Sequence, residues 1–104
     1  YNQLLEKIML EINFFLKSKN KKCFFFIVPQ LFDIKIYKKI NFSEQFYKNI
    51  SKKHDIKIYD LTTDIINIKD VNKIYFDDYY GGHLNKIGNK LVAKLIYNKI
   101  KNSL

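Results

Sequence analysis

One segment of the chain, residues 75 to 89, contains the residue types that catalysis uses most often. It holds Asp77, Asp78 and His83, with the aspartates six and five residues before the histidine. A histidine base needs a carboxylate on Nδ1, because that contact sets the tautomer and leaves Nε2 free to take a proton from a nucleophile. These residues therefore predict a carboxylate–histidine pair that acts as a general base.

The pair can form only if the chain folds back between its members. Gly81 and Gly82 tolerate the backbone angles that such a bend needs. Asn85 is expected to cap a following helix and so to hold His83 beside a rigid element. A solvated turn with a locally hydrogen-bonded histidine is the alternative interpretation. The other histidine, His54, lies at the predicted end of another helix, where it suits the helix dipole and needs no further role.

The apolar residues outside this segment recur with the periods of helices and strands. The predicted elements are a helix from Asn2 to Ser18, a strand from Cys23 to Val28, a helix from Ser43 to Lys53 with Ser43 as its cap, a strand from Ile56 to Leu61 and a helix from Asn85 to Lys101. Strand, helix and strand with short connections favour a right-handed parallel βαβ unit. The first helix is expected to bury an apolar face made of Leu4, Leu5, Ile8, Met9, Ile12, Phe15 and Leu16.

The predicted sheet is incomplete. Two strands cannot give the apolar run 23–28 neighbours on both edges and cover on both faces. We therefore expect the chain to be the C-terminal part of a larger three-layer α/β domain. Residues 62–84 form a long connection with one possible extended piece at 73–76, and a connection of this length is usually functional or carries minor structure of its own.

The composition excludes several classes of protein. The 104 residues carry 19 basic and 10 acidic side chains, a formal net charge of +9, and all of the basic ones are lysine. A nucleic-acid interface usually recruits arginine, whose planar fork grips phosphates and guanine edges, so no nucleic-acid partner is predicted. We attribute the lysine excess to an AT-rich bacterial genome. With 47% apolar residues the chain is too hydrophobic for disorder, and no apolar run is long enough to span a membrane.

Metal, cofactor and disulfide sites have no support in the sequence. The two histidines stand apart, and Cys23 is the one cysteine, which predicts a reduced residue buried in the core. The compartment stays open between cytoplasm and periplasm, and the oligomeric state is left open as well.

The stretch from Asp77 to Ala93 resembles the C-terminal block of SGNH (GDSL-type) hydrolases. It has an aspartate, a short spacer, Gly-His-Leu-Asn, two residues, Gly-Asn and then an apolar helix with Val-Ala, and the wider order of elements is similar too. The resemblance implies a three-layer αβα flavodoxin-like fold with a parallel sheet. It also implies hydrolysis of a small-molecule or carbohydrate ester by a Ser-His-Asp triad without a cofactor, with His83 as general base and Asp78 or Asp77 as the orienting carboxylate.

The chain departs from the family pattern in two ways. In the family, the aspartate usually stands three positions before the histidine, where this chain has Tyr80. The carboxylate would therefore come from Asp78 or Asp77 across a longer loop, and Asp78 is preferred because its loop is longer by fewer residues. The family's Gly-Asp-Ser block and oxyanion-hole blocks are absent, and no serine sits in the strand-to-helix turn that would expose a nucleophile; the serines are Ser18, Ser43, Ser51 and Ser103. The nucleophile is therefore expected outside this chain, and the fragment alone is expected to be inactive.

Two further expectations concern ligands. Residues 30–41 are the only segment that we can name as a wall of the substrate site. A noncatalytic α/β module that binds a carbohydrate or a protein is the alternative function. Tyr75, Tyr79 and Tyr80 suit that alternative, because aromatic rings beside carboxylates are common sugar-contacting surfaces.

Overall fold

The fold is mixed α/β and mostly helical. The computed structural model describes residues 2–37, 42–76 and 78–104. Its elements are α1 (Asn2–Ser18), β1 (Phe25–Ile27), α2 (Leu31–Tyr37), α3 (Phe42–His54), β2 (Ile58–Asp60), α4 (Thr62–Ile66), the 3-10 helix η1 (Val71–Ile74), α5 (Lys86–Ile100) and the 3-10 helix η2 (Lys101–Ser103). Within those residue ranges, no helix combines the length and the apolar character that crossing a membrane requires.

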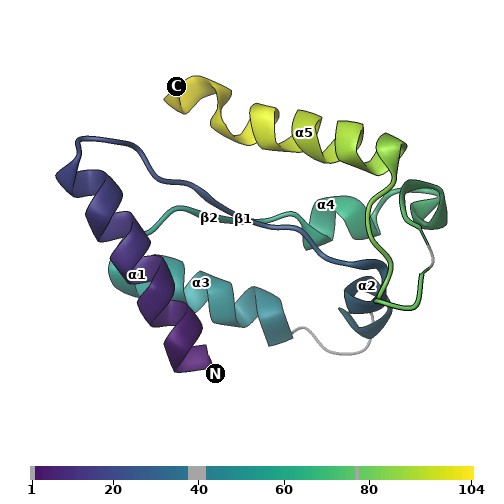
Figure 1. Ribbon diagram of the computed structural model, residues 1–104, viewed down its shortest axis with the longest axis horizontal. Helices are drawn as coiled ribbons and strands as arrows, with labels where there is room; N and C mark the ends of the chain where they lie inside the picture. Colours follow the sequence, from purple (N-terminus) through teal and green to yellow (C-terminus); the bar gives the residue numbers. More distant parts are fainter. Residues whose placement is uncertain (1, 38–41, 77) are drawn as a thin grey trace.

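The two strands form a parallel pair, as the sequence predicts. Phe25 lies opposite Ile58, and Ile27 lies opposite Asp60. Figure 1 shows α5 on one side of this pair, with α1 and α3 on the other. Parallel strands end at the same edge of a sheet, so the residues that follow β1 and β2 meet at one end of the molecule.

The main hydrophobic core lies at that end. Its buried members come from α2, α4, η1, α5 and the residues next to them: Leu31, Ile34, Leu61, Ile65, Ile74, Tyr75 and Val92. The core therefore holds together the elements around the carboxyl ends of the strands. The segment 75–89 begins at Tyr75, which is a member of this core.

The strands and α1 are less buried than the sequence predicts. Every residue of β1 is half-buried, and Val28 just after it is 38% exposed, so the apolar run is not covered on both faces. Cys23, expected in the core, is also only half-buried. α1 has the predicted bounds, but of its apolar face only Met9 is buried; the exposed members are Leu4, Ile8, Ile12 and Phe15. The physical reason is that no described element lies over these side chains.

Several bounds and short elements also differ from prediction. Each strand is three residues long rather than six, and α5 is one residue shorter at each end. The sequence predicted no helix at α2, α4 or η1. Of the expected extended piece at 73–76, the first two residues belong to η1, whereas Tyr75 is extended and forms a bridge with Leu84. α3 begins at Phe42, one residue before the expected Ser43 cap, and the side chain of Ser43 lies outside the described part of the structure.

Candidate active site

The chain between η1 and α5 turns back on itself, and its base is closed by backbone contacts. Tyr75 and Leu84 form an antiparallel bridge, and the Phe76 N–H donates to the His83 carbonyl oxygen at 2.7 Å. We call residues 76–83 the closed loop. The fold-back that the aspartate–histidine spacing requires is therefore present.

Asn85 connects the closed loop to α5. Its Oδ1 accepts from the Gly88 N–H at 2.9 Å, which is the predicted helix cap, and its Nδ2 donates to the Lys73 carbonyl oxygen at 2.7 Å. The Asn85 N–H also donates to the Ile74 carbonyl oxygen at 2.9 Å. His83 consequently stands two residues before the cap of α5, and that cap is hydrogen-bonded to η1.

Within the closed loop, Asp78 reaches His83. Asp78 Oδ2 lies 2.8 Å from His83 Nδ1, while Asp78 Oδ1 accepts from the backbone N–H groups of Tyr80 at 3.0 Å and Gly82 at 3.1 Å. The hydrogen bond from His83, followed by those from Gly82 and Tyr80, lowers the pKa of the Asp78 carboxyl below its ordinary value. An ionised carboxylate only accepts, so Nδ1 carries the proton in a neutral ring and Nε2 keeps the lone pair that a base needs.

The glycine pair makes this geometry possible and joins it to α2. Gly81 and Gly82 have φ angles of +104° and +81°, which other residues rarely adopt. A Cβ atom on Gly82 would also lie 2.5 Å from the Leu31 Cβ. The carbonyl oxygens of Gly82 and Gly81 accept from the Leu31 and Phe32 N–H groups at 3.0 and 2.9 Å. The first turn of α2 is thus bonded to the bend.

A cavity of about 360 Å³ opens beside this histidine. Its lining comes from the residues that follow β1, from the closed loop and the residue after it, and from α5: Val28, Pro29, Gln30, Gly82, His83, Leu84 and Asn89. The side chain of His83 is 54% exposed, so solutes can reach it. Ligands of α/β proteins commonly bind at the carboxyl ends of parallel strands, which is where this cavity lies. Of the predicted wall 30–41, Gln30 lines the cavity. The sequence did not indicate Asn89 as a lining residue, because its position on a helix looks like ordinary exposed surface.

The other predicted site residues are distributed differently. Asp77 lies outside the described residues. Tyr75 is buried and donates its hydroxyl to the Pro29 carbonyl oxygen at 2.7 Å, and burial, with Asp33 nearby, raises its pKa to about 12. Tyr75 therefore cannot belong to a ligand-contacting aromatic surface. Tyr79 and Tyr80 can, because they are 96% and 76% exposed and their rings pair edge to face at 5.5 Å.

No serine among the described side chains lines the cavity. Ser18 donates to the Phe15 carbonyl oxygen at 2.6 Å, and Ser51 donates to the Ile56 carbonyl oxygen at 2.6 Å. Both hydroxyls are occupied by local contacts.

His54, assigned no role from the sequence, has a partner. Its Nε2 lies 2.5 Å from Glu6 Oε1, and both side chains are about four-fifths buried. The hydrogen bond with His54 lowers the pKa of the Glu6 carboxyl. This contact ties α3 to α1, and no sequence signal could have found it, since the residues are 48 positions apart.

The part of the chain that the structure describes contains no group of three or more His, Cys, Asp or Glu side chains placed to hold a metal ion. The chain matches none of the protein families, characterised proteins or solved structures with which it was compared.

Proposed function

We propose that this chain is the C-terminal portion of an SGNH-like ester hydrolase. His83 acts as the general base and Asp78 orients it, while the nucleophilic serine and the oxyanion hole belong to a part of the domain outside this chain. One observation carries the proposal: the Asp78–His83 contact of 2.8 Å at the wall of a cavity beside the carboxyl end of β1.

The reaction would follow the usual steps of acyl transfer. His83 Nε2 takes the proton of the serine hydroxyl as its oxygen attacks the ester carbonyl, and then returns it to the leaving alcohol. A water activated in the same way hydrolyses the acyl-enzyme. Asp78 keeps the proton on Nδ1 throughout and stabilises the imidazolium that forms in each step.

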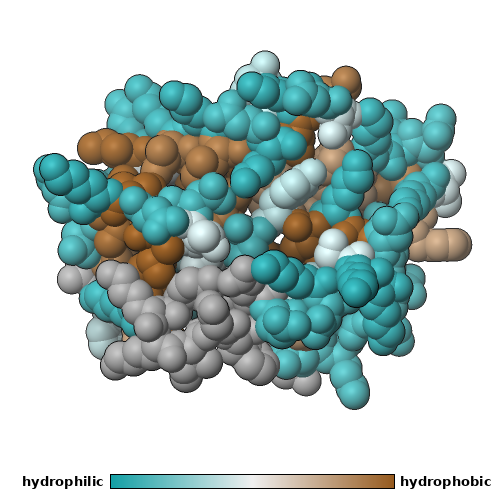
Figure 2. Space-filling model, turned by 180° about the vertical axis from the view of Figure 1, so that it is seen from behind, coloured by the Kyte–Doolittle hydropathy of each residue, from teal (hydrophilic) through white to brown (hydrophobic). Residues whose placement is uncertain are grey.

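The uncovered apolar surface supports a larger domain of three-layer, flavodoxin-like type. β1 pairs with β2 on one edge and, within the described residues, has no neighbour on the other. Figure 2 shows apolar side chains in a band below α5, on the face behind that of Figure 1. A continuation of the parallel sheet beyond β1 would cover such a band. It would also add further strand ends, where a serine could face His83.

The test is ester turnover by the full-length protein. His83→Ala should lower hydrolysis of p-nitrophenyl acetate by several orders of magnitude, because the serine loses its base. Asp78→Asn should also lower it strongly, since an amide can present its N–H to Nδ1 and favour the wrong tautomer. Circular dichroism would show that both variants keep the fold.

The chain offers a matched control. His54 also contacts a carboxylate but does not line the cavity, so His54→Gln should leave turnover within about twofold of the wild type. If His83→Ala and His54→Gln have equal effects, or if His83→Ala has none, the assignment of His83 is wrong.

A noncatalytic binding module remains the second candidate, and one observation favours it. Tyr79 and Tyr80 are two exposed rings in the same loop as Asp78. Such a module would bind a carbohydrate through ring stacking and carboxylate hydrogen bonds. Unchanged sugar binding in Tyr79→Ala and Tyr80→Ala variants would exclude binding through these rings, and a wild type that binds no sugar would exclude the carbohydrate-binding module.

A further inference from the structure

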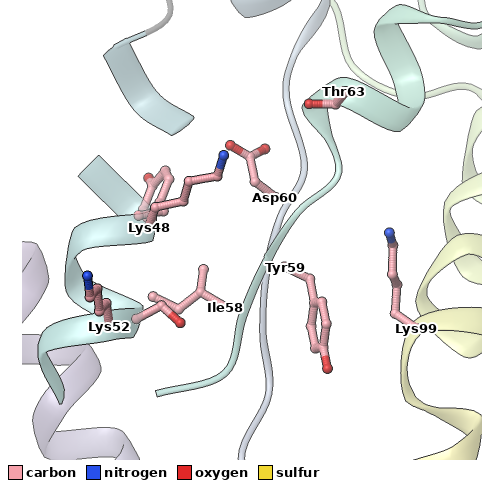
Figure 3. Close-up of a pocket in the computed structure, with 9 residues that line it drawn as sticks. Lys48, Lys52, Ile58, Tyr59, Asp60, Thr63 and Lys99 are labelled. Carbon is pink, nitrogen blue, oxygen red and sulfur yellow. The ribbon is translucent and has the colours of Figure 1, made fainter. Parts of the chain in front are cut away.

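The cavity beside His83 has a polar lining that carries almost no charge. Among the described residues that line it, His83 is the one titratable side chain, although the chain has 19 lysines. A cavity of similar volume, about 340 Å³, lies along β2 and is different, because three lysines line it together with Asp60 (Figure 3): Lys48, Lys52 and Lys99. The cavity beside His83 has no lysine to pair with a carboxylate or a phosphate, so an uncharged ligand suits it best.

Two carboxamides from different elements supply the polar character of this cavity. Gln30 follows β1, and Asn89 lies in the first turn of α5. Both residues are exposed, and neither side chain has a hydrogen-bond partner among the described residues. A carboxamide donates and accepts hydrogen bonds, as a hydroxyl group does. Each of these two side chains can therefore pair with the hydroxyl groups of an alcohol.

Both carboxamides stand on backbone that is held in place. The Gln30 N–H donates to Asp33 Oδ2 at 2.9 Å, at the start of α2. The Gln30 side chain lies over the bend of the closed loop, since a Cβ atom on Gly81 would come within 2.5 Å of its Oε1. The Asn89 N–H donates to the Asn85 carbonyl oxygen at 2.8 Å. Polar groups on rigid elements lose little freedom when a ligand binds, which favours their use in recognition.

We propose that this cavity binds the alcohol part of an ester that carries several hydroxyl groups, as an acylated sugar does. This assignment rests on the proposed function and narrows its substrate to one class. Gln30 and Asn89 bind hydroxyl groups of the alcohol. The leaving alcohol oxygen receives its proton from His83 Nε2, so an alcohol held in the same cavity as His83 is placed for that step.

The test compares the acetate esters of two six-carbon primary alcohols, glucose 6-acetate and hexyl acetate, with the full-length protein. The wild type should hydrolyse glucose 6-acetate with a kcat/KM at least about tenfold higher, because hexanol leaves both carboxamides unpaired. Gln30→Met and Asn89→Leu, which keep the approximate size of each side chain, should each lower kcat/KM for glucose 6-acetate about tenfold, the effect of losing two hydrogen bonds to the substrate. Their kcat/KM for hexyl acetate should change less than about twofold.

Asn98→Leu is the matched control, because Asn98 is an exposed residue of α5 that lines neither of these two cavities. It should leave the turnover of both esters within about twofold of the wild type. The assignment is overturned if the wild type hydrolyses hexyl acetate as well as glucose 6-acetate, or if Gln30→Met and Asn89→Leu lower the turnover of both esters alike. A wild type that hydrolyses neither ester, or a His83→Ala variant that hydrolyses both normally, would overturn the proposed function and this assignment with it.

Discussion

Asp78 uses its two oxygens for two different tasks. Oδ2 contacts His83, while Oδ1 accepts from the backbone of Tyr80 and Gly82 and so shapes the closed loop. The shape of the loop and the orientation of the histidine therefore depend on one carboxylate. The same hydrogen bonds lower the pKa of Asp78, so its carboxylate stays ionised in mildly acidic solution.

Tyr75 joins the closed loop to the end of β1 through one buried hydrogen bond to Pro29. Tyr75→Phe leaves that carbonyl oxygen without its donor and should lower the free energy of unfolding by about 1–3 kcal/mol. The folded pKa of about 12 lies above the ordinary value of 10.0, so the unfolded chain loses this proton first. The stability that Tyr75 contributes should be complete below pH 10 and decline between pH 10 and 12.

Urea unfolding of the wild type and Tyr75→Phe between pH 8 and 12 would measure this difference, because lysine titration affects both proteins alike. Tyr97→Phe is the control, since Tyr97 is 58% exposed on α5. A stability gap between wild type and Tyr75→Phe that stays constant across this range would contradict the prediction.

Among the elements, α1 and α3 are held together by the Glu6–His54 contact. Glu6 has a folded pKa below its ordinary value of 4.5, so its contribution to stability is present above that value and is lost as the pH falls through the folded pKa. Glu6→Gln should therefore be less stable than the wild type at pH 6, and this deficit should shrink as the pH falls below 4.5. Thermal unfolding of both proteins between pH 3 and pH 6 would measure this difference in stability.

Glu11 provides the control for this prediction, because it is exposed on the same helix. Glu11→Gln should follow the wild type at every pH. A Glu6→Gln variant whose deficit is the same at pH 3 and pH 6 would show that the carboxylate does not act through its charge.

The elements also show what sequence patterns can predict. The bounds of α1 and the Asn85 cap of α5 were predictable because helical periodicity and capping are local. α2 was not, because its seven residues are too short for a periodic signal and its first turn is bonded to the glycine carbonyls of the closed loop. The burial of β1, Cys23 and the apolar face of α1 was predicted wrongly, because burial depends on neighbouring elements that no local pattern specifies. The Asp78–His83 contact was predictable because both residues lie in one short loop.

For the molecule as a whole, the exposed stripe of α1 is the main departure from an ordinary surface. Leu4, Ile8, Ile12 and Phe15 follow one another at helical spacing and are between 42% and 60% exposed. Contiguous apolar surface of this kind usually marks an interaction site or a boundary inside a larger protein.

The 104-residue chain alone should therefore enhance the fluorescence of the dye ANS. Ile8→Lys and Ile12→Lys should reduce that signal, whereas Asn98→Lys, which adds the same charge at an exposed position of α5, should not. A longer protein in which a larger domain covers the stripe should bind less dye per molecule. Equal dye binding by wild type and the stripe variants would contradict this account.

The closure of the loop at its base has a consequence for the order of folding. Asp78 and His83 are five residues apart, whereas the paired residues of β1 and β2 are separated by about thirty. A loop of about ten residues closes within roughly 10–100 ns, far faster than a sheet with distant strands assembles. The histidine and its carboxylate should thus meet before the sheet exists, so that half of the proposed site is formed early and later steps only bring other groups to it.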